Sequence, residues 1–407
     1  MAATAHPLMV GHVLHSPSTQ YTILECIGEG KFGKVAKCRA HNSSKLVAVK
    51  ILKKKYFQNV EEELSVLKTI SSLNADHFNL VTFYEQFEYL GYKCLVFELL
   101  DVDLLHLVRS LNVNLIRPIA KQLMVALQGL KAVKIIHTDI KPDNIMMVNI
   151  DESPFSVKLI DFGVAYPISA AMTGLRLQPA GYRAPEICLG LPYSGAIDMW
   201  GVGCTLAFLF LNDNLFPAHC EYLMMQSMVE MLGMPSQHQL HFGIYSKKFF
   251  CHEVDELGTR WRLLTPEEYK SRNRTKAEEW PEYRPHLSSL DDLLYMTELW
   301  DSETIEDRKA CLLTWLFGFR GLNPLPVSSM QSMVEMLGMP SQHQLHFGIY
   351  SKKFFCHEVD ELGTRWRLLT PEEYKSRNRT KAEEWPEYRP HLSSLDDLLY
   401  VSVLYDI

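Results

Sequence analysis

Four polar side chains in the middle of the chain have the types and spacing that transfer of a phosphoryl group requires. Asp139, Lys141 and Asn144 fall within one short stretch, and Asp161 follows 17 residues later in an Asp-Phe-Gly triplet. A carboxylate can orient a hydroxyl and accept its proton, a lysine can neutralise a phosphate, and carboxylate and amide oxygens bind magnesium. Because this reaction leaves little covalent work to the protein, these groups must converge on one phosphate. The pattern therefore predicts Asp139 and Lys141 as catalytic residues and Asn144 and Asp161 as magnesium ligands.

Three glycines near the N-terminus form a second candidate motif. Gly28, Gly30 and Gly33 lie between two predicted strands, and a glycine hairpin can close over a polyphosphate because no side chain obstructs its backbone N–H groups. The spacing alone is weak evidence, because dinucleotide-binding folds use it between a strand and a helix. Here residues 35–40 read as a strand, which disfavours the dinucleotide interpretation. On this motif alone, a glycine-rich hairpin without a ligand stays open.

A lysine ends the otherwise apolar run Val-Ala-Val-Lys50. Such a strand buries alternate residues, so its lysine either extends to water or has an anionic partner. Glu63, on the following amphipathic segment, could be that partner, and Lys50 would then be held against the α- and β-phosphates of ATP. The alternative is that Glu61, Glu62 and Glu63 all face solvent. With Ala-Pro-Glu at 184–186, the order of all these motifs makes chance coincidence negligible.

Together these motifs resemble those of the eukaryotic protein kinases over about residues 20–328. Within that family the chain most resembles the homeodomain-interacting and dual-specificity tyrosine-regulated branch of the CMGC group, through segments 94–100, 182–193 and 261–269. The resemblance implies an α+β bilobal kinase fold, with a small antiparallel β-rich N-lobe and a larger, mainly helical C-lobe. It also implies ATP and Mg²⁺ as cofactors.

The resemblance extends to individual positions of the nucleotide site. Lys50 and Glu63 match the family's ion pair, Phe97 matches the gatekeeper, and the backbone of residues 98–100 matches the adenine contact. Lys141, within Asp-Ile-Lys-Pro-Asp-Asn, is the serine/threonine version of the loop, so Ser and Thr hydroxyls of proteins are the expected acceptors, with tyrosine allowed on the kinase's own loop. The implied nucleotide-binding residues are Ile27, Gly28, Gly30, Gly33, Val35, Ala48, Lys50, Glu63, Phe97, Glu98 and Leu100.

The chain departs from the usual kinase pattern or from that of its branch at three positions of this machinery. Thr138 stands where most kinases have an arginine that binds a phosphate on the activation loop, and the homeodomain-interacting kinases also lack that arginine. Arg176 stands at the position of their autophosphorylated tyrosine, and Ala180 at that of an arginine near the pocket for the residue after the target. We therefore expect basal activity that does not depend on loop phosphorylation, and preference for proline after the target stays open.

Two functions are consistent with these residues. All the residues that would touch nucleotide, metal or acceptor are present, which favours an active serine/threonine kinase. The alternative is a pseudokinase, a scaffold that keeps the fold and nucleotide binding without efficient catalysis. The loop departures support the pseudokinase. The end of the kinase region also supports it, because Arg320 is only the best available candidate to pair with Glu186.

Periodicity predicts the elements that position these residues. Alternation and β-branched residues predict strands over 21–27, 35–40 and 46–52, and apolar positions at helical spacing predict a helix over 60–72. Further helices are expected over 115–133 and 197–211, whereas residues 212–329 read as irregular apart from a helix that starts at Pro266 after a Thr265 cap. The expected domains are a tail (1–20), the N-lobe and hinge (21–100), the C-lobe with an insert (101–329) and a C-terminal segment (330–407).

That C-terminal segment is a copy of part of the C-lobe. Residues 225–295 recur without a substitution as 330–400. Repeats that stack into solenoids drift in sequence and usually number three or more. The copy is therefore interpreted as a recent duplication or a gene-model error rather than an independent domain, and we expect it to pack loosely.

Composition narrows the classes of protein to which the chain could belong. The 407 residues are 47% hydrophobic, and 41 basic against 48 acidic side chains give a net charge of −7. An acidic protein is a poor candidate for direct binding to nucleic acid or to an anionic membrane, and the longest uncharged apolar run, 199–211, is too short to span a bilayer. Nine scattered cysteines without a Cys-x-x-Cys pair are typical of reduced thiols. With no evident secretory signal at the start of the chain, we expect an intracellular protein, nuclear by resemblance or cytoplasmic, that acts on protein substrates; transcription regulators as partners follow from the resemblance only.

Overall fold

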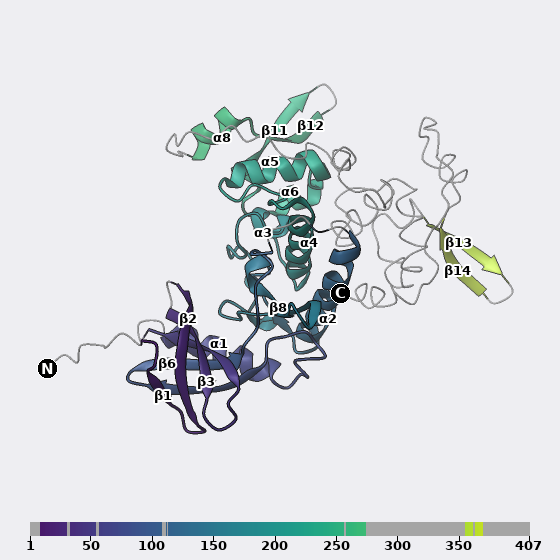
Figure 1. The fold of residues 1–407 in the computed structure, drawn as a ribbon. Helices are drawn as coiled ribbons and strands as arrows, with labels where there is room; N and C mark the ends of the chain where they lie inside the picture. Colours follow the sequence, from purple (N-terminus) through teal and green to yellow (C-terminus); the bar gives the residue numbers. More distant parts are fainter. Residues whose placement is uncertain are drawn as a thin grey trace. The chain divides into compact units, whose positions relative to one another are not determined.

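The computed structural model (Figure 1) describes residues 9–30, 33–53, 57–107, 111, 113–255, 258–273, 355–360 and 363–368. Backbone packing divides the chain into two compact units, Met1–Met172 and Thr173–Ile407. The lobe boundary predicted after residue 100 is a different division and stays a prediction. Within the described part of the chain, no helix is both long enough and apolar enough to cross a membrane.

A six-stranded antiparallel sheet forms the first half of the first unit, with strand order β1-β2-β3-β4-β6-β5. The strands predicted over 21–27, 35–40 and 46–52 are β2, β3 and β4, and the final inversion of β5 and β6 follows from a hairpin that folds back onto the edge. The six strands are β1 Val13–His15, β2 Gln20–Glu29, β3 Gly33–Ala40, β4 Leu46–Leu52, β5 Phe83–Tyr89 and β6 Tyr92–Glu98.

The two faces of this sheet have different roles. On β4, Val47 and Val49 are buried while Ala48 and Lys50 are half-buried on the opposite face, as the two-residue period of a strand requires. The side chains of the buried face form one hydrophobic core, which consists of Leu14, Tyr21, Ile23, Ala36, Cys38, Ala40, Val47, Val49, Ile51, Phe87, Cys94 and Val96. The other face therefore stays available to position polar groups.

Helix α1 (Phe57–Ile70) follows β4. The apolar stripe predicted for it is confirmed, because Val60, Leu64, Leu67 and Ile70 are each at most 4% exposed. These residues lie on one face of a helix of 3.6 residues per turn, and the helix also carries Glu63, which is 5% exposed. The acid predicted as the partner of the strand lysine is thus held on a packed helix face.

Short paired strands in the rest of the first unit bring two loops together. The pair β7–β10 (Ile135–Ile136 and Tyr166–Pro167) and the hairpin β8–β9 (Ile145–Asn149 and Ser153–Leu159) flank both loops. The first loop, residues 137–144, runs from β7 to β8, and the second, residues 160–165, runs from β9 to β10. Because their flanking strands pair, the two loops lie next to each other. The remaining elements of this unit are α2 Val113–Ala132, η2 Pro142–Asn144 and η3 Ile168–Ala170.

The second unit is mainly helical in its described part. Helix α4 (Ala196–Leu211) is buried along almost its whole length, which confirms the core helix expected from the apolar run. The other elements are α3 Pro185–Leu189, α5 Glu221–Leu232, α6 Gln237–Phe242, α7 Ser246–Phe249, β11 Phe250–Asp255, β12 Gly258–Leu263, α8 Pro266–Asn273, β13 Phe355–Asp360 and β14 Gly363–Leu368.

The expectation of irregular structure after residue 212 is wrong over the described residues 212–273. Helix α5 buries Tyr222, Met224 and Met228, and α6 begins with a capping box between Ser236 and Gln239. Methionine and tyrosine carry the buried face there, so a pattern based on leucine and valine misses it. The predicted helix at Pro266 is confirmed as α8.

The duplicated segment repeats the fold of its first copy where it is described. Strands β13 and β14 pair in the same backbone register as β11 and β12, with His357 opposite Trp366 in the ladder as His252 is opposite Trp261. Identical sequence therefore gives an identical hairpin. The expectation that residues 330–407 pack loosely lies, for the rest of that range, outside the described residues.

Candidate active site

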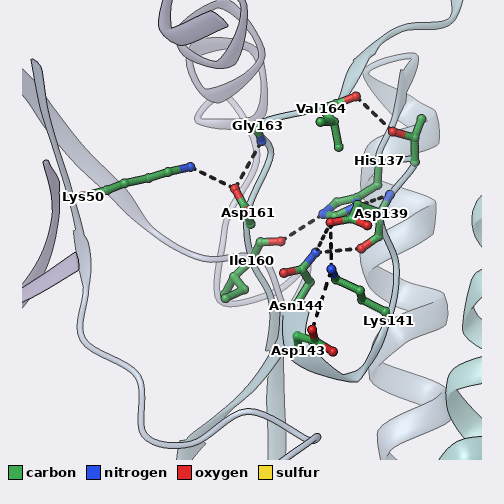
Figure 2. A network of polar contacts seen from close by, with 11 residues as sticks. Lys50, His137, Asp139, Lys141, Asp143, Asn144, Ile160, Asp161, Gly163 and Val164 are labelled. Atoms are coloured by element: carbon green, nitrogen blue, oxygen red, sulfur yellow. Dashed lines mark hydrogen bonds and ion pairs between the residues drawn. The ribbon is translucent and has the colours of Figure 1, made fainter. Parts of the chain in front are cut away.

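The catalytic loop predicted from the sequence fixes Asp139 through short-range bonds. Asn144 Nδ2 donates to the Asp139 backbone oxygen at 2.8 Å and to Asp139 Oδ2 at 2.7 Å, and Lys141 Nζ lies 3.5 Å from the same Oδ2 (Figure 2). Asn144 ends the short helix η2, which Pro142 begins, so the turn itself carries the amide back to the carboxylate. With Nδ2 committed to Asp139, the amide oxygen of Asn144 is the atom that could bind a cation.

His137 connects this loop to the second one. The Asp139 N–H donates to His137 Nδ1 at 3.2 Å, so Nε2 carries the ring proton and donates to the Ile160 carbonyl at 3.0 Å. The ring is fully buried and meets Phe162 edge to face, with centroids 5.0 Å apart. The sequence analysis gave His137 no role. Its place two residues before Asp139 could have indicated one.

Lys50 pairs with two carboxylates from distant parts of the first unit. Its Nζ lies 2.7 Å from Glu63 Oε1 and 2.9 Å from Asp161 Oδ1. Desolvation acts to lower the pKa of Lys50, but Asp161 and then Glu63 outweigh it and hold the pKa above its usual range. The predicted pairing with Glu63 is present, and the structure adds the contact with Asp161 (Figure 2).

The two site carboxylates are shifted in opposite directions. Desolvation raises the pKa of Asp139, and Lys141 and Asn144 offset only part of this effect. Desolvation also acts to raise the pKa of Asp161, but the Lys50 ammonium outweighs it and holds that pKa below its ordinary value. Pairs of groups with separated pKa values mark distinct acid and base roles. Asp161 is thus suited to remain an anion that binds a cation, and Asp139 to accept a proton.

The open face of the sheet carries the predicted nucleotide contacts. Register places Val35 beside Lys50 and Ala48 beside Phe97, all on the face opposite the core, and Ile27 lies exposed on β2. In the glycine motif, the Gly30 N–H donates to the Gly33 carbonyl at 2.9 Å.

The glycines of that motif differ in what restricts them. A Cβ on Gly33 would lie 2.0 Å from the Ile51 oxygen, whereas one on Gly30 would meet no described residue within 4 Å. Packing against β4 is therefore sufficient to require a glycine at position 33. At Gly30 the backbone leaves space that a ligand could use. The residues between them lie outside the described chain.

The hinge is held by a buried lysine that sequence reasoning missed. Lys158, 5% exposed on β9, donates to Glu98 Oε1 and to Asp76 Oδ1, each at 2.6 Å. Glu98 Oε1 also accepts from Thr82 N at 2.6 Å, and Glu98 N donates to the Thr82 carbonyl. Glu98 therefore anchors the hinge through its side chain and its N–H, and Leu100 beyond it is buried. The signal was the same as for Lys50, a lysine within an apolar strand.

In the second unit, an acidic side chain gathers three cations around the predicted activation segment. Glu221, the first residue of α5, contacts Arg176, Arg183 Nη1 at 2.8 Å and Lys248 Nζ at 2.6 Å. Arg183 also donates to the carbonyls of Leu177 and Gln178. Burial acts to raise the pKa of Glu221, but Lys248 first and then the arginines hold it below its usual range. Arg320, the expected partner of the buried Glu186, lies outside the described residues.

Comparison with known proteins identifies the family of the chain. The model of the protein kinase domain family matches residues 21–260, and the chain belongs to that family. It is 39% identical over 305 residues to homeodomain-interacting protein kinase 1 of Mus musculus. The aligned region covers 73% of this chain and 25% of the relative. The homeodomain-interacting protein kinase 1 of Caenorhabditis elegans is 38% identical over 317 residues, 74% of this chain and 37% of the relative.

A yeast relative matches over more of its length. The serine/threonine-protein kinase ppk15 of Schizosaccharomyces pombe is 34% identical over 376 residues, 89% of this chain and 67% of the relative. The chain thus spans only about a quarter of the mouse relative but two thirds of the yeast one. The predicted membership of the homeodomain-interacting and related branch is confirmed, and so is the kinase fold. The family also implies use of ATP with a divalent metal ion, and protein substrates.

Proposed function

We propose that this chain is a protein serine/threonine kinase that transfers the γ-phosphate of ATP to Ser and Thr hydroxyls of proteins. The observation that carries the proposal is the convergence of Lys50, Glu63 and Asp161 by ion pairs next to a loop that holds Asp139 against Asn144. In the reaction, the acceptor oxygen forms a bond to the γ-phosphorus while the bond from that phosphorus to the β,γ-bridging oxygen breaks. The acceptor proton passes to Asp139, and the products are a phosphoester and ADP.

The residues of the site divide this work between them. Asp139 orients the acceptor hydroxyl. Its raised pKa makes its carboxylate a stronger base for the proton that it must accept. Lys141 Nζ, 3.5 Å from Asp139 Oδ2, is placed to neutralise the transferred group. Lys50, kept charged by two carboxylates, would hold the α- and β-phosphates. Electrostatic positioning of this kind is the main source of rate enhancement in phosphoryl transfer.

The donor set fits magnesium. Asp161 and Asn144 offer one carboxylate and one amide oxygen, and the described residues contain no cluster of three or more His, Cys, Asp or Glu side chains that could hold a metal. Mg²⁺ is usually bound by one or two carboxylates together with substrate phosphates rather than by a protein cage. When bound, the ion would neutralise charge on the phosphates.

The class of substrate and the location rest on resemblance. The mouse and worm relatives are named as homeodomain-interacting kinases, which supports transcription regulators as partners and the nucleus as one location. The cytoplasm is the alternative. Arg176 and Ala180, which replace residues of the relatives' activation loop, support activity without loop phosphorylation and leave preference for proline open.

The proposal is tested with three peptides that differ only in a Ser, Thr or Tyr acceptor. We expect transfer of labelled γ-phosphate to the Ser and Thr peptides, loss of transfer on removing Mg²⁺ with a chelator, and loss in Lys50→Met. Lys68→Met, which changes an exposed lysine on α1, is the matched control and should retain the rate. Transfer to tyrosine alone, or equal rates in Lys50→Met and wild type, would contradict the proposal.

A further inference from the structure

Thr138 has an unusual backbone conformation for its residue type. Its φ is 65°, in the left-handed region, and the residue is 3% exposed. A β-branched residue rarely adopts positive φ, because its branched Cβ crowds the backbone there. Such a conformation persists only where surrounding contacts hold it, and these residues concentrate at functional sites. The contacts of Thr138 therefore need a functional explanation.

The side chain of Thr138 reaches from one loop of the site to the other. Its Oγ1 donates to the Val164 carbonyl at 3.0 Å, and Val164 directly follows Gly163 of the Asp-Phe-Gly triplet. His137, the preceding residue, donates to the Ile160 carbonyl on the other side of Asp161. Two consecutive residues of the catalytic loop thus hold both ends of the short segment that carries Asp161; the contact of His137 with Ile160 is drawn in Figure 2.

We propose that Thr138 is a positioning residue whose hydroxyl fixes Asp161 relative to Asp139. This inference rests on the proposed kinase function and deepens it. Thr138 directly precedes Asp139. The positive φ that turns its hydroxyl toward Val164 therefore also sets the direction of the backbone at Asp139. The bond to Val164 limits movement of Asp161, whose own φ is 59°. Without the hydroxyl, the Val164 carbonyl loses the donor that ties it to the catalytic loop, and the segment gains freedom to shift.

The test compares three variants in steady-state transfer assays at several Mg²⁺ concentrations. Thr138→Val keeps the branched shape and removes the hydroxyl, Thr138→Ala removes both, and Thr138→Ser keeps the hydroxyl. We expect kcat to fall about tenfold or more in the Val and Ala variants, which corresponds to about 1.4 kcal/mol in barrier. The Mg²⁺ concentration for half-maximal rate should rise several-fold, while KM for the peptide changes less than about twofold. The Ser variant should stay within about twofold of wild type.

Thr205→Val is the matched control. Thr205 is fully buried in α4, and its hydroxyl donates to the Gly201 carbonyl at 2.8 Å. Its loss should lower the melting temperature without changing kcat or the Mg²⁺ requirement. If the Thr138→Val and Thr138→Ala variants behave in the same way, Thr138 is only structural and the proposal is wrong.

The remaining outcomes are also decisive. Equal impairment of Thr138→Ser and Thr138→Ala would show that the methyl group, not the hydroxyl, matters, and would overturn the proposal. If Thr138→Val does not fold, Thr138→Ala, which tolerates positive φ better, decides alone. If the wild-type protein transfers no phosphate, the proposed kinase function itself fails. In that case, the Mg²⁺-dependent rise in melting temperature with ATP tests Thr138, and an equal rise in wild type and Thr138→Ala contradicts its role.

Discussion

Replacing Glu221 by glutamine should destabilise the second unit more than replacing Arg176, the exposed one of its cationic partners. Glu221 contacts Arg176, Arg183 and Lys248 at once, and as the first residue of α5 it also interacts favourably with the helix dipole. The variant Glu221→Gln keeps an oxygen and the side-chain shape but removes the charge. The change therefore isolates the electrostatic contribution of this acid.

The burial of each partner sets the size of the effect. Arg183 is 8% exposed in its side chain, Glu221 20% and Arg176 65%. Breaking a buried pair costs about 3–5 kcal/mol, but Arg183 keeps two carbonyl acceptors, so we expect a loss of about 2 kcal/mol. The exposed Arg176 pair is worth under about 1 kcal/mol. For a domain of this size, 1 kcal/mol corresponds to roughly 2–4 °C in melting temperature, so Glu221→Gln should lower it by about 4–8 °C.

The effect should depend on pH in a defined direction. The folded state lowers the pKa of Glu221, so its contribution is fully present above the unfolded-state pKa of about 4.3. It is lost as pH falls through the lower, folded-state value. The difference in unfolding free energy between wild type and Glu221→Gln should therefore be constant above about pH 5.5 and shrink below about pH 4.

Urea and thermal unfolding of wild type, Glu221→Gln and Arg176→Gln provide the assay. Arg176→Gln is the matched control, because it removes only the exposed partner of the same carboxylate. Equal losses in the two variants, or a larger loss in Arg176→Gln, would refute the reasoning that the buried Arg183 contact carries the energy. A difference that grows at low pH would contradict the direction of the pKa shift.

Two further predictions concern the activation segment and the duplicated segment. Protein treated with phosphatase should phosphorylate a substrate as fast as untreated protein, because Arg176, at the position expected for the relatives' phosphorylated tyrosine, carries no phosphate and pairs with Glu221; a tenfold drop that autophosphorylation at Thr173 or Tyr182 restores would contradict this. Truncation after Ser329 should leave the transfer rate and melting temperature nearly unchanged, because the first copy already buries Phe250 and Trp261 of the hairpin segment. A large loss of either would show that the second copy is an integral element.

Local patterns predicted the elements that position the site. Alternation along β4 and the helical stripe of α1 depend on burial of one face, which a sequence displays directly. They were sufficient to place Lys50 and Glu63 on facing elements, and the ion pair between them is present. The catalytic loop was equally accessible, because Asp139 and Asn144 lie close in sequence and their hydrogen bond is local.

Contacts between distant segments were not predictable in the same way. Lys50 meets Asp161, 111 residues away, and Lys158 meets Glu98, 60 residues away. Both depend on tertiary packing that leaves no periodic trace in the sequence. The positive φ of Thr138 had no signal at all, because residue type argues against it.

The most direct test of the kinase assignment is transfer of labelled γ-phosphate from ATP to a generic basic protein by wild type, Asp139→Asn and Asp161→Asn. Thermal unfolding with and without Mg²⁺ and ATP shows in parallel that each variant is folded. We predict measurable transfer by wild type and less than about a tenth of that rate in each variant, a barrier increase above about 1.4 kcal/mol, because one variant loses the base and the other a metal ligand. A wild type that binds nucleotide but transfers no faster than the variants would contradict the assignment and identify the chain as a scaffold.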